Sequence, residues 1–74
     1  MTKEEWVIYK NPEPQGDNAY MLALRVIEDG VLKGFKGTAY TALEPSDLYQ
    51  HMPPHVKFKQ DIDGEIDNVV EVWE

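Results

Sequence analysis

Hydrophobic and polar positions alternate along much of this chain, which is typical of β-strands with one buried face. Residues 20–28 show the pattern best, with Tyr20 and every second residue after it on one face. Residues 5–10 are rich in aromatic and β-branched side chains and predict an earlier strand. Between them, residues 11–18 contain two prolines and several turn formers, which predict an exposed loop.

A β-hairpin is predicted at Asp29-Gly30, which lies between two apolar stretches. A type I′ turn needs positive φ at both of its central residues, and Asp-Gly is among the strongest signals for it. A two-residue loop pairs Glu28 with Val31. The same register sets two further pairs opposite each other: Leu24 with Phe35, and Tyr20 with Ala39. The glycines on either side of Phe35 mark a candidate bulge.

Residues 43–52 are the segment that predicts a helix, of two turns at most. Pro45 suits the first helical position, and the proline pair after Met52 ends the segment. Because Leu48 and Met52 are four positions apart, both can face the sheet.

Residues 55–60 and 69–73 predict two final strands that are joined by an acidic turn. A two-residue loop at Asp63-Gly64 places apolar residues opposite charged ones. A three-residue loop over residues 62–64 separates the apolar from the charged face, so we prefer that register. It sets three pairs opposite each other: Val56 with Val70, Lys59 with Asp67, and His55 with Glu71.

Together these elements predict an α+β fold that is mainly β. We expect one small antiparallel sheet of about five strands, curled or barrel-like, with one short helix against it. The length of 74 residues allows a single small domain over residues 1–74. The side chains that we expect to be buried together are Leu22, Leu24, Phe35, Val56, Phe58, Val70 and Val72.

Composition adds a strong charge asymmetry. The formal net charge is −7 and the pI is about 4.6. Residues 1–60 hold eight acids and seven bases, whereas residues 61–74 hold six acids and no base. A polyanion would be repelled, so we expect no direct nucleic-acid binding. Neither a membrane partner nor a signal peptide is indicated, and we expect a cytoplasmic protein.

The acidic C-terminal segment has three competing interpretations. Its carboxylates could simply keep a sheet edge solvated and unpaired. They could dock on a basic protein, including one whose natural ligand is nucleic acid, by imitating phosphates. They could also bind calcium, but the EF-hand pattern wants Gly at position six and Glu at position twelve. Counted from Asp61, these positions fall on Ile66 and Val72, which argues against calcium.

Other chemistry finds little support in the residues. The chain has no cysteine, and its two histidines, His51 and His55, are separated by a proline pair and lack a third ligand. Ser46 is the only serine, and no motif places a base beside it. We therefore expect no enzyme activity, no cofactor and no metal.

Aromatic side chains complete the candidate binding site. Trp6 and Trp73 lie near the two chain ends, on strands that could be neighbours. Tryptophan dominates interface hot spots, so Trp73 beside the acids is a candidate anchor. The predicted partner-binding residues are Asp61, Asp63, Glu65, Asp67, Glu71 and Trp73.

These features favour a small acidic protein, of bacterial or phage origin, that inhibits or modulates a larger basic protein. Anti-restriction, anti-CRISPR and toxin-immunity proteins are often small and acidic in this way. The comparison is with these functional classes and not with a particular family. The alternative is a structural or assembly module that self-associates through a sheet edge or the region of Trp6 and Trp73. The expected state is a monomer or a homodimer.

Overall fold

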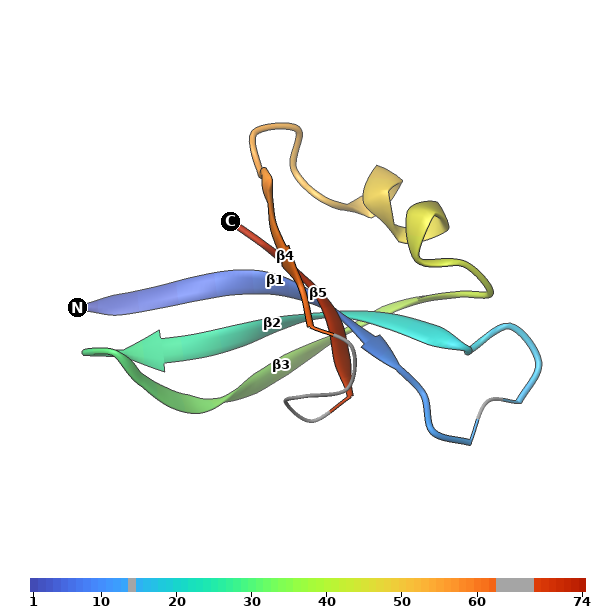
Figure 1. The fold of residues 1–74 in the computed structure, drawn as a ribbon, viewed down its shortest axis with the longest axis horizontal. Helices are drawn as coiled ribbons and strands as arrows, with labels where there is room; N and C mark the ends of the chain where they lie inside the picture. Colours follow the sequence, from blue (N-terminus) through green and yellow to red (C-terminus); the bar gives the residue numbers. More distant parts are fainter. Residues whose placement is uncertain (14, 63–67) are drawn as a thin grey trace.

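The computed structural model describes residues 1–13, 15–62 and 68–74, which form one antiparallel sheet and one short 3₁₀-helix, η1. The strand order is β3-β2-β1-β5-β4 (Figure 1). The element bounds are β1 Thr2–Lys10, β2 Tyr20–Glu28, β3 Val31–Ala42, η1 Pro45–His51, β4 Phe58–Asp61 and β5 Val69–Trp73. This arrangement confirms the predicted mainly β fold with a five-stranded antiparallel sheet and one short helix.

The sheet is strongly coiled but remains open. In Figure 1, β4 and β5 cross β1 and β2 at a steep angle, although β5 is hydrogen-bonded to β1. The edges are β3 and β4, which do not pair with each other in the described part of the chain. The sheet is therefore curled, as expected, without closing into a barrel.

Strand β1 lies at the centre and carries core residues on both of its faces. Val7 and Ile8 are consecutive, point to opposite faces and are both fully buried. The Val7 cluster consists of Val7, Ala23, Ile62, Val69 and Val72, and the Ile8 cluster consists of Ile8, Leu22, Leu48 and Met52. Leu48 belongs to η1, and Met52 is the first residue after η1. Because both pack against Ile8 of β1 and Leu22 of β2, the predicted packing of this helical segment on the sheet is confirmed.

The first hairpin forms at the predicted turn, but farther from the turn its strand pairing differs from the predicted register. Asp29 and Gly30 have φ values of 53° and 82°, and Glu28 pairs with Val31. One register shift between Val26 and Ile27 follows, and another lies between Met21 and Ala23. Leu24 consequently pairs with Lys36 rather than Phe35, and Tyr20 pairs with Ala42 rather than Ala39. The first shift falls at Gly34, one of the two candidate glycines.

The predicted register of the second hairpin is wrong. Asp61, and not His55, lies opposite Glu71, six positions later in the chain. The reason is tertiary, because β5 is held on its other side by β1, where Val72 pairs with Val7. The longer connection also buries Ile62, which is 3% exposed and donates its N–H to the carbonyl of Val70 at 3.0 Å. The predicted pair of Lys59 with Asp67 involves a residue outside the described part.

The helical segment differs from the expectation in type and length. It spans seven residues, Pro45–His51, within the predicted 43–52, and it is a 3₁₀-helix. At the start of the segment, Asp47 donates its N–H to the carbonyl of Glu44 at 3.1 Å. At its end, Met52 donates its N–H to the carbonyl of Tyr49 at 3.1 Å. No side chain caps the N-terminus, and prolines flank the segment, so it stays short.

The predicted core is correct in part. Leu22 and Val72 are fully buried, but they lie in the two different clusters. Phe35 and Phe58 remain 37% and 48% exposed because both hairpins are shifted relative to the prediction. Leu24, Val56 and Val70 are half-buried. The proposed neighbourhood of the tryptophans is confirmed, since Trp6 pairs with Trp73 across β1 and β5.

We predict that Ile8→Ala destabilises the protein far more than Phe58→Ala. Truncation of the buried Ile8 should cost about 3 kcal/mol, because the cavity lies between the sheet and the η1 segment. Phe58→Ala should cost only about 1 kcal/mol, the worth of one aromatic contact with Trp73. Urea unfolding followed by circular dichroism measures both free energies, and equal losses would contradict this assignment of core and surface.

Candidate partner-binding site

The structure brings three of the six predicted site residues together. Asp61 ends β4 and lies directly opposite Glu71 on β5, two positions before Trp73. Asp61 is exposed, whereas Glu71 and Trp73 are half-buried. Asp63, Glu65 and Asp67 lie outside the described residues, so the structure does not describe their part of the predicted site.

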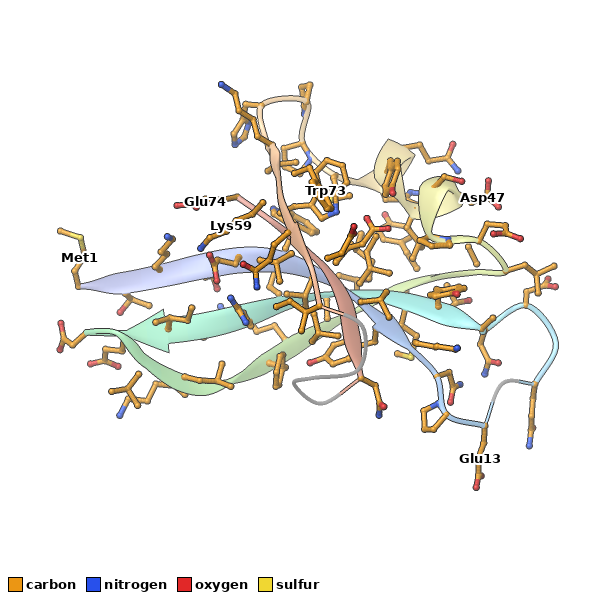
Figure 2. The ribbon with its side chains drawn as sticks, in the orientation of Figure 1. Met1, Glu13, Asp47, Lys59, Trp73 and Glu74 are labelled. Carbon is orange, nitrogen blue, oxygen red and sulfur yellow. The ribbon has the colours of Figure 1, made fainter. Side chains whose placement is uncertain are left out.

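Trp73 is the centre of an aromatic cluster that the sequence did not predict. The ring of Phe58 meets it edge-on, with centroids 5.1 Å apart, and the ring of Tyr49 lies tilted at 4.8 Å. Figure 2 shows Trp73 between β4 and η1. Phe58 and Tyr49 are 48% and 39% exposed, so both rings offer surface to solvent. We call Tyr49, Phe58, Asp61, Glu71 and Trp73 the aromatic–acid patch.

The carboxylate of Glu71 is held in place by this cluster. The Tyr49 hydroxyl donates to it and lies 2.8 Å from Oε1 and 3.0 Å from Oε2. The indole Nε1 of Trp73 donates to Oε1 at 3.0 Å. Burial, the hydrogen bond to Glu71 and the negative charges of Glu71 and Asp61 together raise the pKa of Tyr49 to about 12. The negative charge of Asp61 therefore acts on the Tyr49 hydroxyl, as the charge of Glu71 does.

Tyr49 and Phe58 were missed for different reasons. Phe58 belonged to the predicted core, and only the shifted register of the second hairpin exposes it. Tyr49 lies on η1, 22 positions before Glu71, and no spacing in the sequence links the two. Its position next to the helical residue Leu48, which faces the sheet, was the only available signal.

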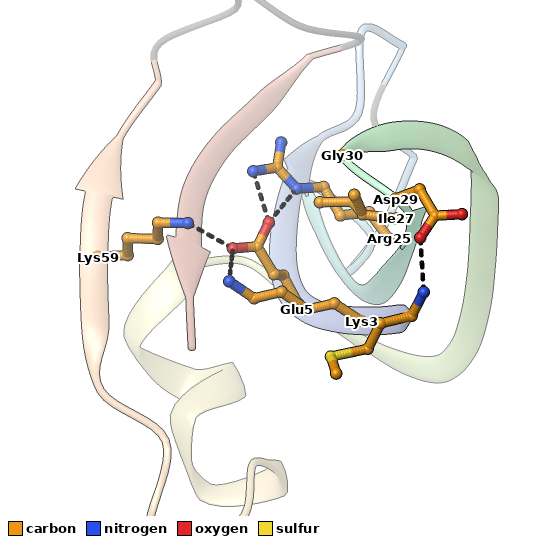
Figure 3. A pocket seen from close by; sticks show the side chains of 8 residues that line it. Lys3, Glu5, Arg25, Ile27, Asp29, Gly30 and Lys59 are labelled. Carbon is orange, nitrogen blue, oxygen red and sulfur yellow. Dashed lines mark hydrogen bonds and ion pairs between the residues drawn. The ribbon is translucent and has the colours of Figure 1, made fainter.

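A second charged cluster surrounds Glu5, whose side chain is fully buried. Arg25 donates through Nε to Oε1 at 2.7 Å, its Nη2 forms an ion pair with the same oxygen at 2.7 Å, and Lys59 Nζ lies 2.6 Å from Oε2. Lys3 Nζ lies 3.7 Å from the same oxygen and 2.6 Å from Glu74. Figure 3 shows the three basic side chains converging on the Glu5 carboxylate. We call Lys3, Glu5, Arg25, Lys59 and Glu74 the Glu5 cluster.

A hollow of about 460 Å³ opens beside the Glu5 cluster, and Ile27 contributes to its wall. Its basic side chains are already paired with Glu5 and Glu74. An incoming anion would have to compete with these carboxylates, so the hollow is a weaker candidate for binding than the aromatic–acid patch. Within residues 1–13, 15–62 and 68–74, no group of three metal-ligating side chains converges.

Comparison with protein family models, with curated proteins and with solved structures finds no match. Among the described residues, no helix has the length and apolar character needed to cross a membrane. The chemistry of the aromatic–acid patch and of the Glu5 cluster is therefore the basis for a functional assignment.

We predict that the Glu5 cluster makes stability fall in acid. Burial alone would raise the pKa of Glu5, but the hydrogen bonds from Lys59 and Arg25 hold it below its ordinary value of 4.5. Since the unfolded state then binds the proton more tightly, the contribution of Glu5 is complete above the ordinary pKa. It is lost as the pH falls through the lower, folded value.

Urea unfolding between about pH 6 and pH 2 measures this loss. Glu5→Gln should flatten the dependence of the unfolding free energy on pH. Glu4→Gln is the matched control, since Glu4 is an exposed neighbour whose ion-pair partner among the described residues is Lys36. An unchanged slope in Glu5→Gln would contradict the assignment.

We further predict that Tyr49 ionises late, at a pH of about 12. Glu71→Gln should lower the pKa of Tyr49 but not restore it fully, because burial is the largest cause of the shift. The change in near-ultraviolet absorbance on alkaline titration measures the ionisation. Tyr49→Phe should remove the late step, and its persistence in that variant would assign it to another tyrosine.

Proposed function

We propose that this chain is a small non-enzymatic protein that binds a larger basic protein and inhibits or modulates it. The observation that supports this proposal best is the aromatic–acid patch. It combines two exposed rings with two carboxylates, Asp61 and Glu71, that form no ion pair in the described part of the chain.

Charge supports the proposal because the acids of this protein are unevenly neutralised. Glu4, Glu5 and Glu74 each pair with lysine or arginine of the same chain. Asp61 and Glu71 belong to the segment of residues 61–74, which carries six acids and no base. A negative surface of this kind speeds association with a positive one and repels wrong partners.

The aromatic side chains give the proposed contact its affinity. Charge complementarity mainly affects the rate of encounter, whereas buried aromatic anchors carry much of the binding energy at interfaces. Phe58 and Tyr49 can lose exposed apolar surface to a partner without any rearrangement of the sheet. Because carboxylates can imitate the phosphates of nucleic acid, a basic surface that ordinarily binds nucleic acid is the class of partner that fits the patch best.

The β3 edge supports a second candidate function, self-association as an assembly module. Val31, Leu32 and Phe35 are 56%, 41% and 37% exposed along this strand of twelve residues. An exposed, partly apolar edge is a template for pairing with another chain. Analytical ultracentrifugation separates the candidates, since a monomer at high concentration would count against self-association.

We predict that removal of charge from the patch slows association with the partner. The double variant Asp61→Asn/Glu71→Gln should reduce the association rate by about threefold to tenfold at low salt. It should also weaken the dependence of the rate on salt. The partner is first isolated by pull-down from the native host, and rates are then measured from low to high salt.

The matched control is Glu13→Gln/Asp17→Asn, which changes the net charge equally on exposed residues of another loop. Figure 2 shows Glu13 in the loop at the lower right, well separated from Trp73 in the upper middle. A further variant that also neutralises Asp63, Glu65 and Asp67 extends the test to the rest of the acidic segment. Equal rates and salt slopes for all variants would leave the solvated-edge interpretation standing.

A further inference from the structure

We infer that the aromatic–acid patch recognises an arginine side chain of the partner. This inference rests on the proposed function and names the chemical group that the patch takes. It depends on three features of the patch: a pair of acids without an ion-pair partner among the described residues, partly exposed aromatic rings and a carboxylate that is oriented in advance.

The first feature is the cross-strand pair of Asp61 and Glu71. Like charges directly opposite each other on neighbouring strands are destabilising. Elsewhere the chain avoids this cost by placing a base beside the acid, as with Arg25 opposite Glu5. No described lysine or arginine forms an ion pair with Asp61 or Glu71. A cation supplied from outside would relieve the repulsion.

The second feature is the aromatic cluster beside Glu71, in which the rings of Tyr49 and Phe58 lie next to Trp73. A cation within about 6 Å of a ring centroid is attracted by the aromatic face. Phe58 and Tyr49 both lie against Trp73, with ring centroids 5.1 Å and 4.8 Å from its own, and both keep exposed surface. A planar guanidinium can stack on such a ring while its edge stays free for hydrogen bonds, which a compact ammonium cannot do.

The third feature is the remaining hydrogen-bonding capacity of the two carboxylates. A carboxylate accepts about four hydrogen bonds. Glu71 receives the Tyr49 hydroxyl across both oxygens and the Trp73 indole on Oε1, which leaves acceptor capacity on Oε2. Asp61 accepts no side-chain hydrogen bond from any described residue, so that part of the chain leaves its acceptor capacity unused. The five N–H donors of a guanidinium match two adjacent carboxylates better than the three donors of an ammonium.

The Glu5 cluster shows the same chemistry completed within the chain. There Arg25 donates to one oxygen of the Glu5 carboxylate and Lys59 donates to the other. The charge of this carboxylate is therefore already paired within the chain. The aromatic–acid patch has the carboxylates and the rings but lacks its own guanidinium. The missing component is therefore the one that we expect a partner to provide.

The experiment uses the full chain and three short, blocked peptides of glycine and serine that carry arginine, lysine or citrulline. Binding is followed by NMR titration, with the indole N–H of Trp73 as the reporter. The Nε–H of Arg25 reports binding at the Glu5 cluster instead. We expect the arginine peptide to bind about fivefold more tightly than the lysine peptide. Citrulline keeps the shape without the charge, and its peptide should not bind.

Two phenylalanines provide a matched pair of variants. Phe58→Leu keeps an apolar side chain in the patch but removes one of its exposed rings, and it should reduce the preference for arginine over lysine. Phe35→Leu makes the same change at a similarly exposed ring on the other face of the sheet, next to Tyr9, and should leave the preference unchanged. Asp61→Asn/Glu71→Gln should weaken both peptides.

Equal binding of arginine and lysine peptides, with both weakened by Asp61→Asn/Glu71→Gln, would overturn the arginine inference while leaving the proposed function intact. No shift of the Trp73 indole with any peptide at millimolar concentration would also overturn it. Failure of the proposed function itself would appear separately, as equal association rates of wild type and charge variants with the isolated partner.

Discussion

The buried carboxylate of Glu5 is the constraint on which the rest of this sheet depends. A charge without access to water is tolerated only when cations and hydrogen-bond donors surround it. Arg25 on β2 and Lys59 on β4 supply these groups, so one side chain of β1 ties together strands from both hairpins. Apolar packing alone would tolerate several strand registers, whereas the ion pairs require Glu5 to face Arg25 and to lie within reach of Lys59.

The position of β4 links this cluster to the aromatic–acid patch. Lys59 reaches Glu5 on one face of the sheet, while its neighbour Phe58 meets Trp73 on the other. The same register brings Asp61 opposite Glu71 and places Ile62 in the Val7 cluster. A hairpin with the shorter loop would have paired His55 with Glu71 and placed a basic group where the repulsion now lies. The opposition of the two acids in the patch thus accompanies the register that satisfies the buried Glu5.

The two clusters have different roles: the Glu5 cluster stabilises the fold, and the aromatic–acid patch is the proposed binding surface. In the Glu5 cluster, charges of opposite sign neutralise each other within the chain and stabilise the fold. In the aromatic–acid patch, two like charges and two exposed rings remain, held by the Tyr49 and Trp73 hydrogen bonds. A preorganised surface loses little conformational entropy on binding, which suits a small protein with a modest core. The curled sheet brings η1 close enough to β5 for Tyr49 to complete this surface.

Local sequence signals determined the elements of this protein, and long-range packing decided how they meet. The alternation of residues 20–28 and the Asp29-Gly30 turn predicted β2 and the first turn correctly, because period and turn chemistry act over a few residues. The sequence also identified Asp61, Glu71 and Trp73 as candidate site residues. It could not identify Tyr49 or Phe58, nor the opposition of Asp61 and Glu71. Those depend on the register between β4 and β5, which local charge pairing predicted wrongly. The central strand β1, by pairing Val7 with Val72 and by holding Glu5 against Lys59, selects that register through contacts between residues more than fifty positions apart.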